Sequence, residues 1–364
     1  LPSEIPGRWG SYGAMSPDSH SLRSRKDRGP AAGASRPPSS LSLVTQLSDS
    51  LDFSHGPAWR NRVALAPLTN KQSNPDGSLS DTEINWLLAR ARHGFGMVMT
   101  AAAYVAQAGK AWNGQLGISD DAHLPGLERL ASGIRDAGAA SLVQIHHGGA
   151  KADPAASGEP AVAPYDDPTT GARALTTGEI ESAIEDFAAA AARAERAGFD
   201  GVQLHGAHGY LLCQFLDAHN TREDGYGGDL HGRSRIIRET IAAVRAATSS
   251  DFHLGLRLST ERFGLSTPEI AQLSGELMAE GGLDHLDLSL WDVTKLPEGA
   301  ADGDAPLVSH FVDLPRGGTR LGIAGKVASG PTATAALAAG VDFVVVGRAA
   351  IADQRIAERI LSTS

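Results

Sequence analysis

The sequence predicts an α/β protein built on a single (β/α)8 barrel, also called a TIM barrel. The main observation is a repeated phrase, in which an amphipathic helical stretch is followed by a glycine and then by a short apolar run. Helices that alternate with strands indicate a parallel sheet. Strands this short and this apolar are covered on both faces, and eight such units are the number that closes a barrel.

Eight stretches are expected to form the barrel strands, and most of them follow a glycine that stops a helix. They are residues 62–66, 97–101, 141–145, 201–205, 253–258, 285–289, 320–324 and 343–347. Glycine suits such stops because it adopts a left-handed backbone without strain. A doubly wound fold would instead carry a glycine-rich turn after its first strand, and Ala-Pro-Leu-Thr at residues 66–69 is not such a turn.

Two segments of different character are expected along the chain. Residues 1–40 carry nine serines and six prolines without apolar periodicity. We therefore expect a disordered N-terminal extension or, in part, a remnant of an expression vector. A transit peptide is disfavoured because Pro30, Pro37 and Pro38 would break an amphipathic helix. Residues 41–364 are expected to form the barrel, with a long loop over its mouth at 146–177, after the third strand.

Composition narrows the classes of function. Acidic residues outnumber basic ones by 42 to 32, so the net charge is −10 and no basic face argues for nucleic acid. No apolar run is long enough to suggest a membrane span. Cys213 is the single cysteine, so no internal disulfide can form, which fits the cytoplasm. We expect small-molecule partners and a monomer or homodimer.

Polar groups gather just after the predicted strands, where barrel enzymes place their active sites. Strand four ends at His205, and His208 and Tyr210 follow shortly after it. Imidazole N–H groups can donate to an oxygen, and a phenol can deliver a proton near neutral pH if another group takes the charge. Each of these residues could be an ordinary loop residue, but three such groups within six residues favour a site.

The last two strands end in a pattern typical of barrel phosphate sites. Gly325 and Lys326 follow strand seven, and Gly347 and Arg348 follow strand eight. Backbone N–H groups and the amino end of a helix can hold a phosphate there, and an arginine adds charge-assisted donors. The alternative for Arg348 is an ion pair with an acidic neighbour such as Asp353.

Two polar residues within the predicted strands need partners. Gln144 lies among apolar residues in strand three, and a flat heterocycle with alternating donors and acceptors would satisfy its amide. Arg257 in strand five cannot lose its proton, so it needs an anion. The alternative for Arg257 is an ion pair within the barrel.

The region after strand four carries three short motifs, which are H-G-A-H-G-Y at residues 205–210, N-T-R at 220–222 and Y-G-G at 226–228. Together they resemble the old yellow enzyme family of FMN-dependent ene-reductases. The resemblance covers most of residues 50–361. It implies FMN as the cofactor, NAD(P)H as the reductant and an activated alkene as the acceptor. The chain departs from the family at Lys71, where some members carry an aromatic residue, and at Lys326, where a smaller or apolar residue is commoner.

The resemblance also implies a role for each matched residue. His205 and His208 would bind the carbonyl oxygen of the acceptor, and Tyr210 would donate a proton. The residues implied to contact FMN are Ala66, Pro67, Leu68, Thr69, Ala102, Gln144, His205, Arg257, Gly325, Lys326, Gly347 and Arg348. No metal is implied.

The implied function is the NAD(P)H-dependent reduction of activated C=C bonds in α,β-unsaturated carbonyl or nitro compounds. One alternative is a dehydrogenase or demethylase of the same family that acts on amines or lactams, although a histidine pair suits an anionic oxygen better. Another is a non-catalytic barrel that binds a phosphorylated ligand, which would need only Gly325, Gly347 and Arg348.

Overall fold

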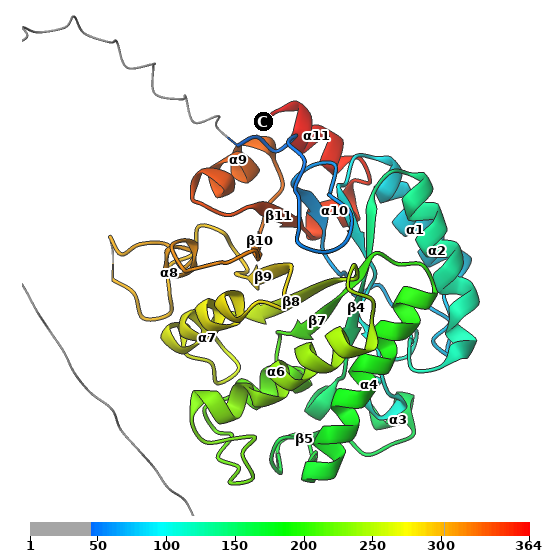
Figure 1. The fold of residues 1–364 in the computed structure, drawn as a ribbon, viewed down its shortest axis with the longest axis vertical. Coiled ribbons are helices and arrows are strands. Elements are labelled where there is room, and N and C mark those ends of the chain that lie inside the picture. Colours follow the sequence, from blue (N-terminus) through cyan, green and yellow to red (C-terminus); the bar gives the residue numbers. More distant parts are fainter. Residues whose placement is uncertain (1–44, 302) are drawn as a thin grey trace, which may run out of the picture. The chain divides into compact units, whose positions relative to one another are not determined.

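The computed structural model describes residues 45–301 and 303–364, and the extension expected at residues 1–40 lies outside these ranges. In the described ranges, parallel strands form a barrel surrounded by helices, as predicted (Figure 1). The eight barrel strands are β1 (Val63–Leu65), β2 (Met97–Met99), β4 (Ala140–His146), β7 (Gly201–Gly206), β8 (His253–Ser259), β9 (His285–Ser289), β10 (Arg320–Ala324) and β11 (Phe343–Val346). Each agrees with its predicted range to within two residues at either end, because short buried apolar runs mark such strands clearly.

Hydrogen-bonded pairing closes the barrel. Neighbouring strands follow the order β2, β1, β11, β10, β9, β8, β7 and β4, and β4 pairs in turn with β2. In that closing pair Met97 lies opposite Ala140, and Met99 lies opposite Leu142. The short β3 (Ala103–Tyr104) adds to the carboxyl end of β4. These pairings are all parallel, so the carboxyl ends of the strands meet at one end of the barrel.

The helices lie outside the strands (Figure 1). The main ones are α1 (Asp81–Arg92), α2 (Leu124–Asp136), α4 (Thr177–Arg196), α6 (Leu230–Ala247), α7 (Thr267–Glu280), α8 (Ser309–Val312), α9 (Gly330–Ala338), α10 (Arg348–Ala352) and α11 (Ile356–Ser362). Of these, α1, α4, α6 and α9 begin at a side-chain cap. Thr176 and Glu179 form a capping box at the start of α4. The glycines expected to stop helices before β2, β4, β7 and β11 all have positive φ; they are Gly94, Gly138, Gly198 and Gly340.

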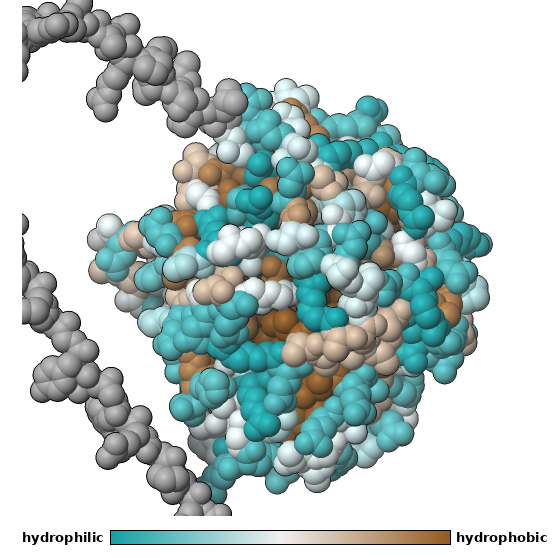
Figure 2. Space-filling model, viewed as in Figure 1, coloured by the Kyte–Doolittle hydropathy of each residue, from teal (hydrophilic) through white to brown (hydrophobic). Residues whose placement is uncertain are grey.

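Apolar side chains fill the amino end of the barrel. Leu51 and Trp59 pair as an antiparallel bridge, and the centroid of the Trp59 ring lies 5.0 Å from that of Phe343 and 5.8 Å from that of His285. Hydrophilic residues predominate on the face shown in Figure 2, because the apolar sides of the helices face the strands. None of the helices in the described ranges is both long and apolar enough to cross a membrane.

Residues 146–177, which connect β4 to α4, hold several short elements. They are a 3-10 turn (Gly149–Lys151), α3 (Pro154–Ser157), β5 (Val162–Ala163) and β6 (Arg173–Ala174), and β5 pairs with β6 in parallel. The sequence predicted only a long loop here, because elements this short show no periodicity.

The N-T-R and Y-G-G parts of the family motif stabilise this region. The Asn220 side chain donates to the carbonyls of Phe215 and Tyr226 at 2.9 and 2.8 Å. The Arg222 guanidinium donates to the carbonyls of Pro164 and Leu175 at 2.6 Å each. These residues therefore connect the chain after α5 (Leu211–Leu216) to the excursion between β4 and α4.

Candidate active site at the carboxyl end of the barrel

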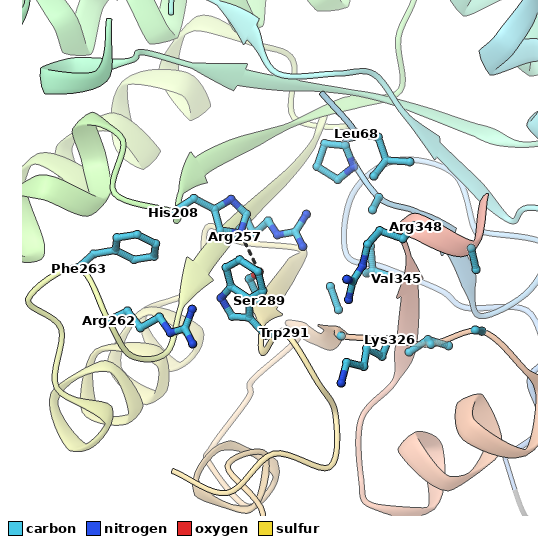
Figure 3. Close-up of a pocket in the computed structure, with 18 residues that line it drawn as sticks. Leu68, His208, Arg257, Arg262, Phe263, Ser289, Trp291, Lys326, Val345 and Arg348 are labelled. Carbon is cyan, nitrogen blue, oxygen red and sulfur yellow. Dashed lines mark hydrogen bonds between the residues drawn. The ribbon is translucent and has the colours of Figure 1, made fainter. Parts of the chain in front are cut away.

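A cavity of about 1060 Å³ opens at the carboxyl ends of the strands. Its lining comes from residues that follow or end β1, β7, β8, β9, β10 and β11 (Figure 3). Four cationic side chains line it and no carboxylate does; the cations are Arg257, Arg262, Lys326 and Arg348. The charge of the lining therefore favours an anionic ligand.

The cavity brings together most of the residues that the sequence singled out. Those that line it are Ala66, Pro67, Leu68, His208, Arg257, Gly325, Lys326, Gly347 and Arg348. Those outside the lining are Thr69, Ala102, Gln144, His205 and Tyr210. Thr69 is exposed to solvent, whereas Ala102, Gln144 and His205 are buried.

Arg348 and Lys326 lie at the end of the cavity formed by β10 and β11 (Figure 3). Arg348 forms no ion pair within the described ranges. Asp353, the acid considered as its alternative partner, pairs with Arg359 Nε at 3.1 Å instead. The Lys326 Nζ contacts Asp292 Oδ2 at 2.8 Å, so its charge is partly compensated. Arg348 is therefore the free cation at this end of the cavity.

Arg257 projects from β8 into the cavity (Figure 3). Its Nε lies 3.3 Å from Asp287 Oδ2 of β9, so the ion pair considered from the sequence is present. Arg257 is 6% exposed, and within residues 45–301 and 303–364 its Nε has no hydrogen-bond acceptor. The rest of its guanidinium remains able to donate to a ligand in the cavity.

Gln144 belongs to a chain of buried hydrogen bonds inside the barrel. Its Nε2 donates to Gln203 Oε1 at 2.9 Å. Gln203 Nε2 lies 2.9 Å from His285 Nε2, and His285 Nδ1 lies 2.7 Å from His253 Nε2. Because an amide nitrogen only donates, His285 accepts at Nε2 and donates from Nδ1 to His253. This series of hydrogen bonds therefore determines that the Gln144 amide nitrogen faces Gln203. The sequence did not reveal Gln203 as a partner of Gln144.

His205, His208 and Tyr210 come together beside the cavity. The ring centroids of His205 and His208 are 5.1 Å apart, as are those of His205 and Tyr210. His205 Nε2 lies 3.4 Å from His208 Nδ1, and His208 Nε2 lies 2.8 Å from the Ser289 hydroxyl. The convergence expected from the sequence is therefore present, although only His208 lines the cavity.

A left-handed turn after β7 determines the directions of the His208 and Tyr210 side chains. His208 has φ 62° and Gly209 has φ 69°, and the His208 N–H donates to the Ser259 hydroxyl at 2.9 Å. A Cβ at Gly209 would lie 2.8 Å from the Phe263 ring and 2.9 Å from Lys151 Nζ, so only glycine fits. Tyr210 then precedes α5, the apolar run Leu211–Leu216.

Burial sets the protonation of the three side chains. It lowers the pKa of His208 to about 3 and that of His205 well below the ordinary value, with smaller contributions from nearby cations. Burial raises the pKa of Tyr210. At neutral pH the imidazoles are therefore uncharged and the phenol keeps its proton, so each side chain has one hydrogen to donate.

Several lining residues were missed from the sequence. Ser289 ends β9 and Trp291 follows it, and Arg262 and Phe263 follow β8. The rule that located His205, that polar residues at strand ends form the site, applies equally to the end of the sixth barrel strand at Ser289. His146 at the end of β4 was likewise given no role, and its ring centroid lies 4.4 Å from that of Tyr210.

Comparisons with known proteins identify the family of this chain. A sequence model of the NADH:flavin oxidoreductase / NADH oxidase family matches residues 56–363. The chain is 35% identical over 319 residues to "Probable NADH-dependent flavin oxidoreductase YqiG" of Bacillus subtilis, covering 84% of this chain and 85% of that protein. It is 34% identical over 313 residues to an NADH oxidase of Thermoanaerobacter brockii, covering 81% of this chain and 47% of that longer protein.

Solved structures show the same architecture. An old yellow enzyme homologue from Zymomonas mobilis superimposes with a TM-score of 0.76 at 26% identity, covering 87% of this chain and 93% of the other. A morphinone reductase mutant in complex with tetrahydroNAD superimposes with a TM-score of 0.75 at 28% identity, covering 88% and 92%. The family match spans almost the whole barrel and includes the H-G-A-H-G-Y motif. The chain therefore belongs to the NADH:flavin oxidoreductase / NADH oxidase family, and is an FMN-dependent NAD(P)H oxidoreductase of the old yellow enzyme type.

Proposed function

We propose that this enzyme reduces activated C=C bonds of α,β-unsaturated carbonyl or nitro compounds. The observation that carries the proposal is the convergence of His205, His208 and Tyr210, three uncharged hydrogen donors, beside a cavity lined with cations. FMN, when bound, accepts two electrons from NAD(P)H and supplies them to the alkene as a hydride. The protein would bind the acceptor oxygen, orient the alkene and supply a proton.

The residues present fit FMN. Arg348 has no ion pair within the described ranges and would hold the phosphate, together with the backbone at Gly325 and Gly347. Arg257 has donors free for the ring and a positive charge suited to the anion that forms on reduction. We assign Ala66, Pro67, Leu68, Thr69, Ala102 and Gln144 to contacts with the ring, as the family resemblance implies.

The histidine pair would bind the acceptor oxygen beside His205 Nε2 and His208 Nδ1, which lie 3.4 Å apart. The Ser289 hydroxyl can donate to His208 Nε2 at 2.8 Å, which leaves the imidazole proton on Nδ1. An oxygen to one side of this pair, at hydrogen-bond distance from both nitrogens, would then accept two hydrogen bonds. Such donors stabilise the enolate-like charge that develops in the transition state.

Two alternatives are less well supported. Uncharged imidazole donors suit an anionic oxygen better than a protonated amine, which disfavours an amine dehydrogenase or demethylase. A non-catalytic phosphate-binding barrel would leave the histidines and Tyr210 without a role. The deciding experiment is anaerobic reduction by NADPH, followed by separate additions of enones, nitroalkenes, amines and lactams. Rapid re-oxidation by enones is expected, and re-oxidation only by another class would contradict the proposal.

Arg348→Ala is expected to weaken FMN binding roughly ten- to a hundred-fold, because a charge-assisted contact with the phosphate is lost. Flavin release measured by fluorescence during dilution gives the dissociation constant. Arg359→Ala is the matched control, since it removes an exposed arginine that pairs with Asp353 near the same helix. Equal FMN affinity in the wild type and Arg348→Ala would mean that the phosphate lies elsewhere.

Arg262 and Trp291 lie next to each other in the lining of the cavity, and we call this pair the rim (Figure 3). The Arg262 guanidinium lies 4.9 Å from the centroid of the Trp291 ring. Six non-glycine residues in the described ranges have positive φ, and five of them line this cavity; they are His208, Arg262, Phe263, Trp291 and Lys326. Backbone strain of this kind gathers at ligand sites. We assign this rim to the diphosphate of NAD(P)H.

Arg262→Gln is expected to weaken the binding of tetrahydroNAD roughly three- to tenfold, the effect of losing one partly exposed charged contact. Titration monitored by the flavin spectrum measures the affinity. Arg235→Gln is the control, because Arg235 also lies over an aromatic ring, Tyr226, at 4.5 Å, and has the same side-chain exposure of 45%. An unchanged affinity in Arg262→Gln, or an equal loss in Arg235→Gln, would contradict the assignment.

The remaining expectations concern the cellular location and the oligomeric state of the enzyme. A cytoplasmic location and a monomeric or homodimeric state remain predictions from the sequence. Cys213, the single cysteine of the chain, is buried in α5. Sedimentation of the purified protein would measure the oligomeric state directly.

A further inference from the structure

The carboxylate of Asp287 lies beside Arg257, on the neighbouring strand β9. Asp287 is completely buried in β9, and its Oδ2 lies 3.3 Å from Arg257 Nε. In the described ranges neither oxygen makes a hydrogen bond of good geometry, although the Gln203 side chain lies close enough to act on the carboxyl. Burial raises the pKa of the Asp287 carboxyl, and Arg257 and, to a smaller extent, Gln203 oppose that shift. Arg257 is therefore the strongest of the groups that favour the charged form of Asp287.

A buried aspartate at the start of the same strand shows the contrast. Asp284 Oδ2 accepts from Arg245 Nη2 at 2.7 Å and from the Leu254 N–H at 2.8 Å. Its Oδ1 accepts from the His55 N–H at 3.0 Å. Asp284 thus connects neighbouring segments at the amino end of the barrel. Asp287 has only Arg257 and, more weakly, Gln203 to compensate its charge. A poorly compensated buried carboxylate destabilises a fold, so its presence is better explained by an effect on the ligand of Arg257.

We propose that Asp287 is a positioning residue that orients the Arg257 guanidinium and offsets part of its positive charge beside the FMN ring. The inference rests on the proposed contact between Arg257 and FMN. Reduction adds negative charge to the ring, so a nearby cation favours the reduced state and a nearby carboxylate disfavours it. Asp287 therefore lowers the midpoint potential of the bound cofactor and makes the reduced enzyme a stronger reductant.

The test is the midpoint potential of the FMN-loaded enzyme, measured by equilibration with a reference dye. In Asp287→Asn the negative charge is lost, while the amide oxygen can still face Arg257 Nε. At a fixed potential, the ratio of reduced to oxidised flavin is expected to rise roughly ten- to a hundred-fold, which equals about 30–60 mV for a two-electron couple. Asp287→Glu keeps the charge and is expected to keep the potential close to that of the wild type.

Asp284→Asn is the matched control. It makes the same change at another buried, ion-paired aspartate just before β9, but at the amino end of the barrel. Thermal stability is expected to fall in Asp284→Asn, with no change in the midpoint potential. If Asp287→Asn does not fold, Asp287→Ser removes the same charge and carries the same expectation.

The outcomes separate this inference from the proposed function. A wild-type chain that takes up no FMN would overturn both. A folded, FMN-loaded Asp287→Asn enzyme with an unchanged or lower potential would overturn only the role of Asp287. A raised potential in both Asp287→Asn and Asp284→Asn would also overturn it, because the effect would then be one of general destabilisation.

Discussion

Tyr210→Phe is expected to slow re-oxidation of the reduced enzyme by a simple enone by ~10²–10⁴-fold, the usual contribution of a positioned acid. The substitution keeps the ring, which packs 5.1 Å from His205 and 4.4 Å from His146 between ring centroids. It removes only the hydroxyl. Because burial raises the pKa of Tyr210, the phenol is protonated at neutral pH and can donate its proton to the α-carbon of the alkene after hydride addition.

The two half-reactions should respond differently. Reduction of the enzyme by NADPH requires no proton from Tyr210 and should proceed at nearly the wild-type rate in Tyr210→Phe. Nitroalkenes should be slowed less than enones, because a nitronate is stable enough to leave and be protonated in water. Stopped-flow absorbance of the flavin follows each half-reaction separately.

Tyr165→Phe provides the control for this prediction. Tyr165 is a half-buried tyrosine near the site, and its hydroxyl donates to Asp217 Oδ2 at 2.9 Å. It lies outside the main cavity lining, so its loss should leave both half-reactions unchanged. Equal slowing of both half-reactions in Tyr210→Phe, or slowing of neither, would sink the assignment of Tyr210 as proton donor.

Replacement of both His205 and His208 by alanine is expected to abolish the spectral shift that phenols cause on binding beside the flavin. The loss of a single oxyanion donor typically slows turnover ~10²–10³-fold, so the double variant should be slower still with enones. FMN should stay bound, because we assign its phosphate and pyrimidine contacts to other residues. Titration with a para-substituted phenol measures this binding.

The pH dependence supplies a second check on the histidine pair. Burial lowers the pKa of His208 to about 3 and keeps that of His205 well below the ordinary value. Both imidazoles should therefore stay neutral between about pH 5 and 8, and phenol affinity should show no step near the ordinary histidine pKa. A step of that kind that disappears in the double variant would show that an imidazole titrates there.

His147→Ala is the control for the double variant. His147 is also buried at the end of β4, with its pKa lowered to about 4, and it accepts from the Gly149 N–H at 3.1 Å. It takes no part in the contacts among His205, His208 and Tyr210. Phenol binding should survive in His147→Ala, and normal phenol binding in the double variant would count against the proposed acceptor site.

The sequence by itself determined the barrel and the end of it that carries the site. Short apolar runs, most of them after a glycine stop, marked all eight strands, because strand formation and helix termination depend on residues close together in the chain. The rule that barrel sites follow strand ends then picked out residues such as His208, Arg257 and Arg348, which line one cavity.

Pairs between residues far apart in the sequence were decided only by the tertiary structure. Arg257 meets Asp287 because β8 and β9 are neighbours in parallel register, with these two residues opposite each other. Arg348 stays free of Asp353 because Arg359 takes that carboxylate. Which of several chemically suitable partners is used depends on strand register and side-chain direction, and neither leaves a local signal in the sequence.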